Sequence, residues 1–348
     1  MRVLVTGHNG YLGSVMVKVL QSAGHEVLGL DNYFFASCGT GEKQQIRALS
    51  KDVRDVGPHD LAGLDAVVHL AALCNDPLGD LNPAWTLEIN HVASRQLAAL
   101  AKGGGVPRFL YASSCSMYGA AGDEIVDEEA PLRPLTPYAT SKVRAEEDIS
   151  NLADGNFSPI FLRNATAYGM SPRFRSDVLL NNLVCWAYTT HRIRITSDGT
   201  SWRPIIHVQD IAGAFAAILV APRAAVHNQA FNVGSNAENY QVRGLADIVH
   251  EVLPDCEVEY AAGAAPDPRS YRVSFDKLAR LIPAYAPKWN ARRGAREVYD
   301  GVRKAALRLE DFRGRKFTRV AQLKYLLDQG LLDSTLRWSA GRGRIVYG

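Results

Sequence analysis

The sequence lacks the signatures of several classes of protein. Its five cysteines are odd in number and form no CxxC pair, which fits a reducing compartment better than a disulfide framework. No group of residues has the spacing of metal ligands, so we expect no metal. No apolar run approaches the roughly 20 residues of a membrane span. A strand pattern begins at Arg2 and leaves no room for a signal peptide, so we expect a cytoplasmic protein.

Long runs of one charge are also missing. The formal net charge is +3, and the basic residues are scattered along the chain, so we expect neither a nucleic-acid nor a membrane partner. The nearest approach to a basic run is residues 313–319, which we interpret as a solvated face. What is present is 348 residues, 47% of them hydrophobic. That is enough for one large domain, or for one large and one small domain.

The first half of the chain alternates between strand-like and helix-like segments. The predicted strands are residues 1–7, 25–32, 66–72, 108–114 and 158–169, and the predicted helices are residues 13–24 and 83–102. Such alternation predicts an α/β fold of the Rossmann type, a doubly wound parallel sheet with helices on both faces. Ligands of such sheets bind at the carboxyl ends of the strands.

The pattern loosens after about residue 170. Helices are predicted near residues 177–190, 208–221 and 244–253, and short strands at 192–196, 230–233 and 257–260. We predict a first, nucleotide-binding domain of residues 1–170 with contributions from 205–235. A smaller, discontinuous substrate lobe would comprise residues 171–204 and 236–348, including an amphipathic helical tail from residue 294.

A glycine-rich turn follows the first predicted strand. Gly7, Gly10 and Gly13 have the spacing GxxGxxG, which lets backbone N–H groups at a helix N-terminus reach a pyrophosphate. Asp31 ends the second strand, 18 residues after Gly13. A carboxylate there accepts hydrogen bonds from a ribose 2′-OH and repels a 2′-phosphate, so NAD is favoured over NADP. Arg2 and Lys43 are the nearest cations that could weaken this preference.

The stretch YATSK at residues 138–142 places Tyr138 and Lys142 on one face of a helix. A tyrosine is a poor base at neutral pH, but a nearby ammonium group would stabilise its phenolate. Tyr138 could then take a proton from a hydroxyl group while hydride leaves the same carbon. Ser114, at the end of the strand 108–114, would hydrogen-bond the same oxygen.

With these motifs the sequence resembles the extended short-chain dehydrogenase/reductase family, the nucleotide-sugar epimerases and dehydratases. The stretches that carry the resemblance are TGHNGYLG (6–13), LDN (30–32), DV (52–53), HLAA (69–72), SSCSMYG (113–119), YATSK (138–142), RNATAYG (163–169) and WRPIIHVQD (202–210). The resemblance implies an NAD cofactor, a nucleoside diphosphate sugar as substrate and the catalytic set Ser114, Tyr138 and Lys142. It also suggests a homodimer through the helices at 84–102 and 138–153.

The resemblance further implies two sets of binding residues. The expected cofactor contacts are Gly7, Asn9, Gly10, Tyr11, Leu12, Gly13, Asp31, Asn32, Asp52, Val53, Leu70, Ala71, Ala72, Asn90, Tyr138 and Lys142. The expected substrate contacts are Asn75, Ser114, Cys115, Ser116, Asn164, Arg203 and Arg269. The arginines suit a diphosphate because their planar fork pairs with phosphate oxygens.

The residues at the two positions that follow Ser114 distinguish the reactions catalysed by members of this family. The 4,6-dehydratases usually carry Asp and Glu where this chain has Cys115 and Ser116, and related decarboxylases keep a Glu at the second position. A simple 4-epimerase needs no such acid pair. Cys115 could carry a proton during inversion at C3 or C5. Alternatively it is a small buried residue, which strand alternation would turn away from Ser114 unless the strand has already ended.

We therefore expect an NAD-dependent nucleotide-sugar epimerase that oxidises the sugar transiently to a ketone. The alternatives are a ketosugar reductase that consumes NADH, and less readily a dehydratase or decarboxylase. A non-enzymatic NAD-sensing module is disfavoured because both Tyr138 and Lys142 are present. In the loop at residues 73–83, Asn75, Asp76 and Asp80 either read sugar hydroxyls or form turns.

Overall fold

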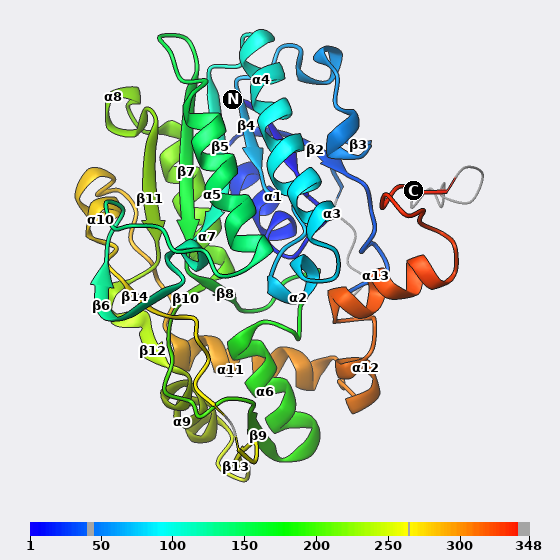
Figure 1. Ribbon diagram of the computed structural model, residues 1–348, viewed down its shortest axis with the longest axis vertical. Coiled ribbons are helices and arrows are strands. Elements are labelled where there is room, and N and C mark those ends of the chain that lie inside the picture. Colours follow the sequence, from blue (N-terminus) through cyan, green and yellow to red (C-terminus); the bar gives the residue numbers. More distant parts are fainter. Residues whose placement is uncertain (40–44, 264, 340–348) are drawn as a thin grey trace.

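The computed structural model describes residues 1–39, 45–263 and 265–339. Its largest element is a parallel sheet of seven strands in the order β11-β7-β5-β4-β1-β2-β3, with helices on both faces (Figure 1). The strands of this sheet are β1 (Arg2–Thr6), β2 (Glu26–Asp31), β3 (Ala48–Ser50), β4 (Ala66–His69), β5 (Arg108–Ser114), β7 (Ser158–Asn164) and β11 (Gln229–Val233). The predicted Rossmann-type fold is confirmed.

Both faces of the sheet are buried because its strands are almost continuously apolar. Val3 and Val5 point to the face covered by α1 (Gly13–Ser22) and α7 (Val208–Val220), whereas Leu4 points to the other face. The helices of that second face are α3 (Pro83–Leu87), α4 (Ala93–Gly103) and α5 (Pro137–Ser150). Each strand therefore contributes alternate side chains to two separate cores.

The long helix predicted at residues 83–102 contains a π-helical turn, Glu88–Val92, between α3 and α4. Asn90 lies in this turn and is fully buried. Its Oδ1 accepts from Leu73 N–H at 2.8 Å, and its Nδ2 donates to Leu73 O at 3.0 Å and to Ser141 Oγ at 3.2 Å. These bonds use both donors of the amide and leave one acceptor position on Oδ1, so the predicted cofactor contact of Asn90 stays a prediction. It ties the loop after β4 to α5.

The second lobe lies at the carboxyl edge of the sheet (Figure 1). The strand predicted at 158–169 divides at Ala165, and its second part leaves the large sheet to join a smaller one, β12-β10-β8. The strands of the lobe are β6 (Ala120–Val126), β8 (Thr166–Tyr168), β9 (Arg192–Ile195), β10 (Trp202–His207), β12 (Asn239–Gln241), β13 (Glu257–Tyr260) and β14 (Ser270–Val273). Its core helices are α6 (Leu179–Thr190), α9 (Val242–Val252) and α11 (Ala291–Lys304).

Shorter segments connect these elements. They are α2 (Asp76–Gly79), α8 (Arg223–Val226), α10 (Asp276–Leu281), α12 (Leu309–Arg313) and the 3₁₀ turns Val53–Asp55, Pro58–Leu61, Cys115–Tyr118 and Asn236–Glu238. Among the described residues, no helix is both long and apolar enough to cross a membrane.

The end of the described chain returns to the first domain. Helix α13 (Arg319–Asp328) lies beside α2 and α3 (Figure 1). Leu323, Leu326 and Leu336 are buried in the core between the sheet and α4. The predicted domain boundary is therefore corrected, because buried residues of the segment 319–339 pack with the first domain rather than with the substrate lobe.

Candidate active site

Ser114 and Tyr138 meet at the carboxyl edge of the sheet. Ser114 ends β5, and its Oγ accepts from Ser116 N–H at 3.1 Å and donates to Ser116 Oγ at 2.9 Å. Thr136 caps α5 by accepting from Ala139 N–H, which fixes the first turn and so the position of Tyr138. Ser114 lies close enough to Tyr138 to lower the pKa of its hydroxyl group. The structure therefore places these two predicted catalytic side chains near each other.

Lys142 lies one helical turn after Tyr138 and is 3% exposed. Its Nζ donates to Ala112 O at 2.7 Å and lies 5.8 Å from the centroid of the Tyr138 ring. Burial lowers the pKa of Lys142 to about 8. Burial also raises the pKa of Tyr138; Cys74 and Asp76 add to this rise, and Ser114 and the charge of Arg175 oppose it. Burial therefore outweighs the stabilisation of a phenolate, and Arg175 is a cation near Tyr138 that the sequence did not indicate.

Cys115 faces away from this site. Its side chain is in the core, 1% exposed, and its S–H donates to Arg163 O at 3.1 Å. Burial raises the pKa of the thiol. β5 ends at Ser114, and the 3₁₀ turn that begins at Cys115 directs its side chain into the core that contains Leu110. The burial and the bond to Arg163 O contradict the hypothesis that Cys115 carries a proton at the sugar, and its expected substrate contact: in this structure Cys115 packs in the core.

The glycine-rich turn between β1 and α1 fits a diphosphate. Gly7 has a φ of +71°, and a Cβ there would lie 2.9 Å from Ala71 N; a Cβ at Gly13 would lie 2.0 Å from Gly7 O. The backbone N–H groups of Tyr11 and Leu12 donate to no acceptor within the described part of the chain. Free N–H groups at the start of a helix favour an anion. The Tyr11 side chain instead points into the protein and donates to a carbonyl of the loop after β8.

Asp31 lies beside this turn, at the carboxyl end of β2. Its carboxylate accepts from Asn9 N–H at 3.1 Å and from Tyr33 N–H at 2.7 Å. Burial raises the pKa of Asp31, and His8, these two hydrogen bonds and Arg173 oppose the rise. The position and the partly satisfied carboxylate fit the predicted contact with a ribose.

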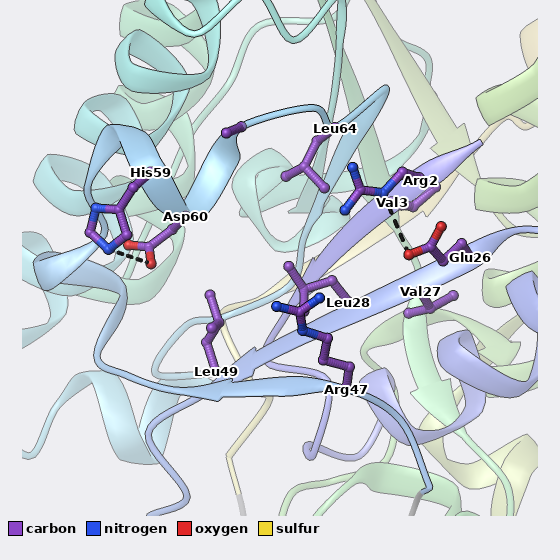
Figure 2. Close-up of a pocket in the computed structure, with 11 residues that line it drawn as sticks. Arg2, Val3, Glu26, Val27, Leu28, Arg47, Leu49, His59, Asp60 and Leu64 are labelled. Atoms are coloured by element: carbon purple, nitrogen blue, oxygen red, sulfur yellow. Dashed lines mark ion pairs between the residues drawn. The ribbon is translucent and has the colours of Figure 1, made fainter.

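The cations around Asp31 differ from those that the sequence suggests. Arg2 lies at the other end of the sheet, where it pairs with Glu26 and lines the pocket of Figure 2. Lys43 lies outside the described residues. Arg173, from the loop after β8, is the cation that acts on Asp31. Its Nε and Nη2 donate to Asn9 Oδ1 at 2.9 and 2.7 Å.

The C-terminal segment contacts both loops that carry the predicted adenosine contacts. Asp52 accepts from Arg54 Nε and Nη2, both at 2.9 Å, and Arg54 in turn donates to Leu336 O at 2.8 Å. Trp338 Nε1 donates to Asn32 O at 2.6 Å. The side chain of Asp52 therefore serves first as an ion-pair partner, and its contact with a cofactor stays a prediction. The same holds for the strand-end residues Asn32, Val53, Leu70, Ala71 and Ala72.

The two arginines predicted for the substrate lie together on the second lobe. Arg203 Nη2 and Arg269 Nη2 both bind Asp267 Oδ2, at 2.8 and 2.6 Å. Arg269 also pairs with Asp76 in the loop after β4, and Thr136 Oγ1 donates to Asp76 Oδ1 at 2.7 Å. Two carboxylates thus neutralise two guanidinium groups, and the chain of ion pairs connects the second lobe to the start of α5.

Two asparagines of the predicted substrate set also border the site. Asn164 is paired with Ser114 across β5 and β7, and its Oδ1 is buried without a hydrogen-bond partner among the residues described. This unused acceptor fits a bound hydroxyl or amide group. Asn75 caps α2 with its side-chain oxygen, and its Nδ2 donates to Asp177 Oδ2 at 3.4 Å. The substrate contacts of both residues and of Ser116 stay predictions.

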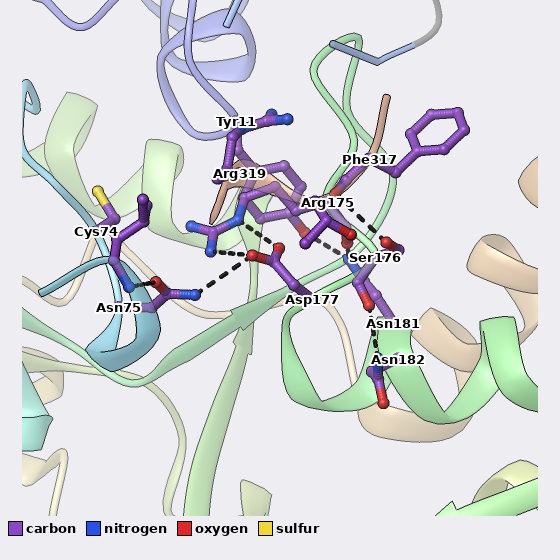
Figure 3. A network of polar contacts seen from close by, with 12 residues as sticks. Tyr11, Cys74, Asn75, Arg175, Ser176, Asp177, Asn181, Asn182, Phe317 and Arg319 are labelled. Carbon is purple, nitrogen blue, oxygen red and sulfur yellow. Dashed lines mark hydrogen bonds and ion pairs between the residues drawn. The ribbon is translucent and has the colours of Figure 1, made fainter. Parts of the chain in front are cut away.

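A group of buried arginines was not predicted. Arg173, Arg175 and Arg319 are 7%, 6% and 3% exposed. Arg175 binds both oxygens of Asp177, at 2.8 and 2.9 Å, and Figure 3 shows this pair together with Arg319 between Tyr11 and the loop after β4. The two arginines of SPRFRSD, directly after a buried strand, were a signal. No sequence signal marked Arg319, because residues 313–319 have the pattern of a solvated basic face.

Taken together, the Rossmann sheet, the glycine-rich turn, Asp31 and the Ser114–Tyr138–Lys142 set define a nucleotide-dependent enzyme of short-chain dehydrogenase type. The profile of the NAD dependent epimerase/dehydratase family matches residues 3–234, and the chain belongs to this family. Its cofactor is NAD.

Individual relatives differ in their reactions. The chain is 30% identical to the UDP-glucose 4-epimerase of Corynebacterium glutamicum over 81% of this chain and 90% of that protein. The structure of the NAD-dependent NDP-hexosamine 5,6-dehydratase TunA superimposes with a TM-score of 0.78 at 25% identity, covering 87% of this chain and 98% of that one. MoeE5 in complex with UDP-glucuronic acid and NAD gives 0.74 at 26% identity, covering 88% and 100%. The chain is thus a nucleotide-sugar-modifying enzyme.

Proposed function

We propose that this chain is a nucleotide-sugar epimerase that oxidises the sugar transiently to a ketone and returns the same hydride to the opposite face. The observation that carries the proposal is the end of β5. Cys115 is buried and bonded to Arg163 O, and the Ser116 hydroxyl is bonded to Ser114. Elimination of water would need a proton acceptor and a proton donor beside the catalytic set, and this turn supplies no carboxylate.

The remaining side chains suffice for an epimerisation at the oxidised carbon. NAD supplies the acceptor and donor of hydride when bound. Tyr138 takes the proton of the sugar hydroxyl and later returns it, while Ser114 holds the same oxygen by a hydrogen bond. The Lys142 ammonium, fixed on Ala112 O, and the Arg175 guanidinium stabilise the negative charge that forms on Tyr138.

The substrate class proposed is a nucleoside diphosphate sugar. Arg203 and Arg269 are two forked donors within one ion-pair group, which suits the two phosphates of such a ligand. The relatives named above act on or bind uridine or other nucleoside diphosphate sugars, which supports the same class.

Incubation with a panel of UDP- and dTDP-linked hexoses and hexuronic acids, followed by NMR, tests the proposal. We expect an epimer to accumulate without added NAD and without net change in NADH absorbance. Consumption of stoichiometric NADH would instead identify a ketosugar reductase. Loss of water or carbon dioxide from the sugar would identify a dehydratase or a decarboxylase, and either result would overturn the proposal.

We also propose a homodimer through α3–α4 and α5. Val92 is 41% exposed on this surface, and Pro58, Ala99 and Leu100 line a mostly apolar depression beside it. Burial of such a surface favours association of two copies. Light scattering at micromolar concentration checks this proposal, and a clean monomer contradicts it.

A further inference from the structure

Arg175 and Arg319 are two buried cations beside one carboxylate. Both are nearly inaccessible to solvent. Asp177 binds Arg175 through both of its oxygens and also acts on Arg319, which has no ion pair of its own among the described residues. A guanidinium group keeps its proton inside proteins. A buried charge without its own counter-ion is strongly unfavourable, so Arg319 favours a further anion.

Arg319 is the member whose charge is least satisfied. Its Nη2 donates to Arg173 O at 2.6 Å, and its guanidinium lies 5.3 Å from the centroid of the Phe35 ring. Its Nη1 is buried and has no hydrogen-bond partner in residues 1–39, 45–263 and 265–339. Burial lowers the pKa of Arg319. An orphaned donor on a buried cation indicates an acceptor that belongs to a ligand.

The loop that carries Arg173 and Arg175 is fixed to the glycine-rich turn. Ser171 Oγ donates to Tyr11 O at 2.7 Å. Asn181 Nδ2 donates both to Tyr11 Oη at 3.1 Å and to Arg175 O at 2.9 Å. The charge of Arg175 also acts on Tyr138 and opposes the rise of its pKa that burial causes. Arg175 is therefore close to Tyr138, and Figure 3 shows it together with Tyr11 of the glycine-rich turn and Arg319.

We infer that Arg319 and Arg175 bind the diphosphate of NAD, in addition to the backbone of the glycine-rich turn. A diphosphate supplies negative charge beside Arg319 and several acceptor oxygens for its unused donor, and the arginine fork matches phosphate oxygens. Helix α13 and the loop at residues 171–177 then hold the cofactor in place. The inference depends on the use of NAD by the family, and not on which reaction the chain catalyses.

Isothermal titration of nucleotide-free protein with NAD, ADP-ribose and UDP tests the inference on Arg319→Met. We expect the dissociation constants of NAD and ADP-ribose to rise at least about tenfold, while that of UDP changes by less than about twofold. Arg313→Met is the matched control, because Arg313 lies in the same basic segment with an exposed side chain. It should leave all three constants unchanged.

Thermal melting separates a lost ligand contact from a lost fold. Without nucleotide, Arg319→Met should melt no lower than wild type, because a buried unpaired charge has been removed; with saturating NAD its gain in melting temperature should be smaller. If Arg319→Met fails to fold, Arg319→Lys should weaken NAD binding in the same direction by less. Unchanged NAD affinity in the folded variant, or a loss confined to UDP, overturns the inference.

Discussion

The two arginine groups of this molecule differ in how their charges are met. On the substrate lobe, Arg203 and Arg269 share Asp267, and Asp76 binds the second of them. On the cofactor side, Arg175 binds both carboxylate oxygens of Asp177, and Nη1 of Arg319 has no hydrogen-bond partner among the described residues. Among the described residues, the first group has one carboxylate for each guanidinium group, whereas Arg319 in the second group has no ion pair.

The difference corresponds to two kinds of ligand. A substrate enters and leaves in each catalytic cycle, so the arginines that bind it need other ion-pair partners while the site is empty. Asp267 and Asp76 are these partners, and we call them placeholders for the diphosphate. A cofactor that is reoxidised in place stays bound, so it can be the permanent counter-ion of a buried cluster. The placeholder arrangement weakens substrate affinity, because one set of ion pairs is exchanged for another, but it avoids buried unpaired charge.

Tyr138 stands between the two groups, and its removal should have the largest effect. Tyr138→Phe keeps the ring but loses the proton acceptor, so turnover should fall by roughly 10² or more. Affinities for NAD and UDP should stay near those of wild type, because neither arginine group is altered. Steady-state kinetics with parallel calorimetry measures both, and Tyr260→Phe, on an exposed strand of the second lobe, is the control. Near-normal turnover in Tyr138→Phe contradicts the site.

The cofactor side should also discriminate between NAD and NADP. Asp31 repels a 2′-phosphate, so NAD should bind at least about tenfold more tightly, or about 1.4 kcal/mol. Arg173 lies close enough to act on Asp31, so Asp31→Asn should narrow or reverse the preference. Calorimetric titration of both nucleotides checks this, and an equal preference in the wild-type protein would sink the role of Asp31.

On the substrate side, removal of a placeholder carboxylate should strengthen ligand binding rather than weaken it. Asp267→Asn frees Arg203 and weakens the hold on Arg269, so UDP should bind about three times more tightly, and NAD affinity should not change. Asp247→Asn, an exposed position on α9, makes the same change of charge away from the site and should have no effect. Weaker UDP binding in Asp267→Asn would show that Asp267 orients the arginines rather than competing with the ligand.

The fold was predictable because its signals are local, and the same kind of signal led to the catalytic set, whose role stays a prediction. Strand and helix alternation gave the seven parallel strands, and the spacings GxxGxxG and YxxxK gave Gly7, Tyr138 and Lys142. These patterns reflect one turn or one helix face, which a short stretch of sequence encodes. The prediction for Cys115 left two possibilities open, and the structure favours packing, because the turn that begins at Cys115 buries the thiol against Arg163 O.

The arginine cluster could not be predicted because its parts come from distant segments. In the basic stretch at residues 313–319, Arg313 and Arg315 are exposed whereas Arg319 is buried. Nothing local distinguishes them, since burial of Arg319 follows from the return of α13 to the first domain. The role of Asn90 was missed for a similar reason: a π-helical turn aims its amide at the loop after β4. Contacts between segments far apart in the sequence determine the burial and the partners of such residues.

The most direct test of the central claim is to run the reaction in D₂O and to read the product by NMR. An epimerisation at the oxidised carbon moves only hydride, so we expect product without solvent deuterium on carbon. Cys115→Ala should give the same product at a rate within about twofold of wild type, since Cys115 is a packing residue. Deuterium at a carbon beside the inverted centre, abolished by Cys115→Ala, would contradict the account.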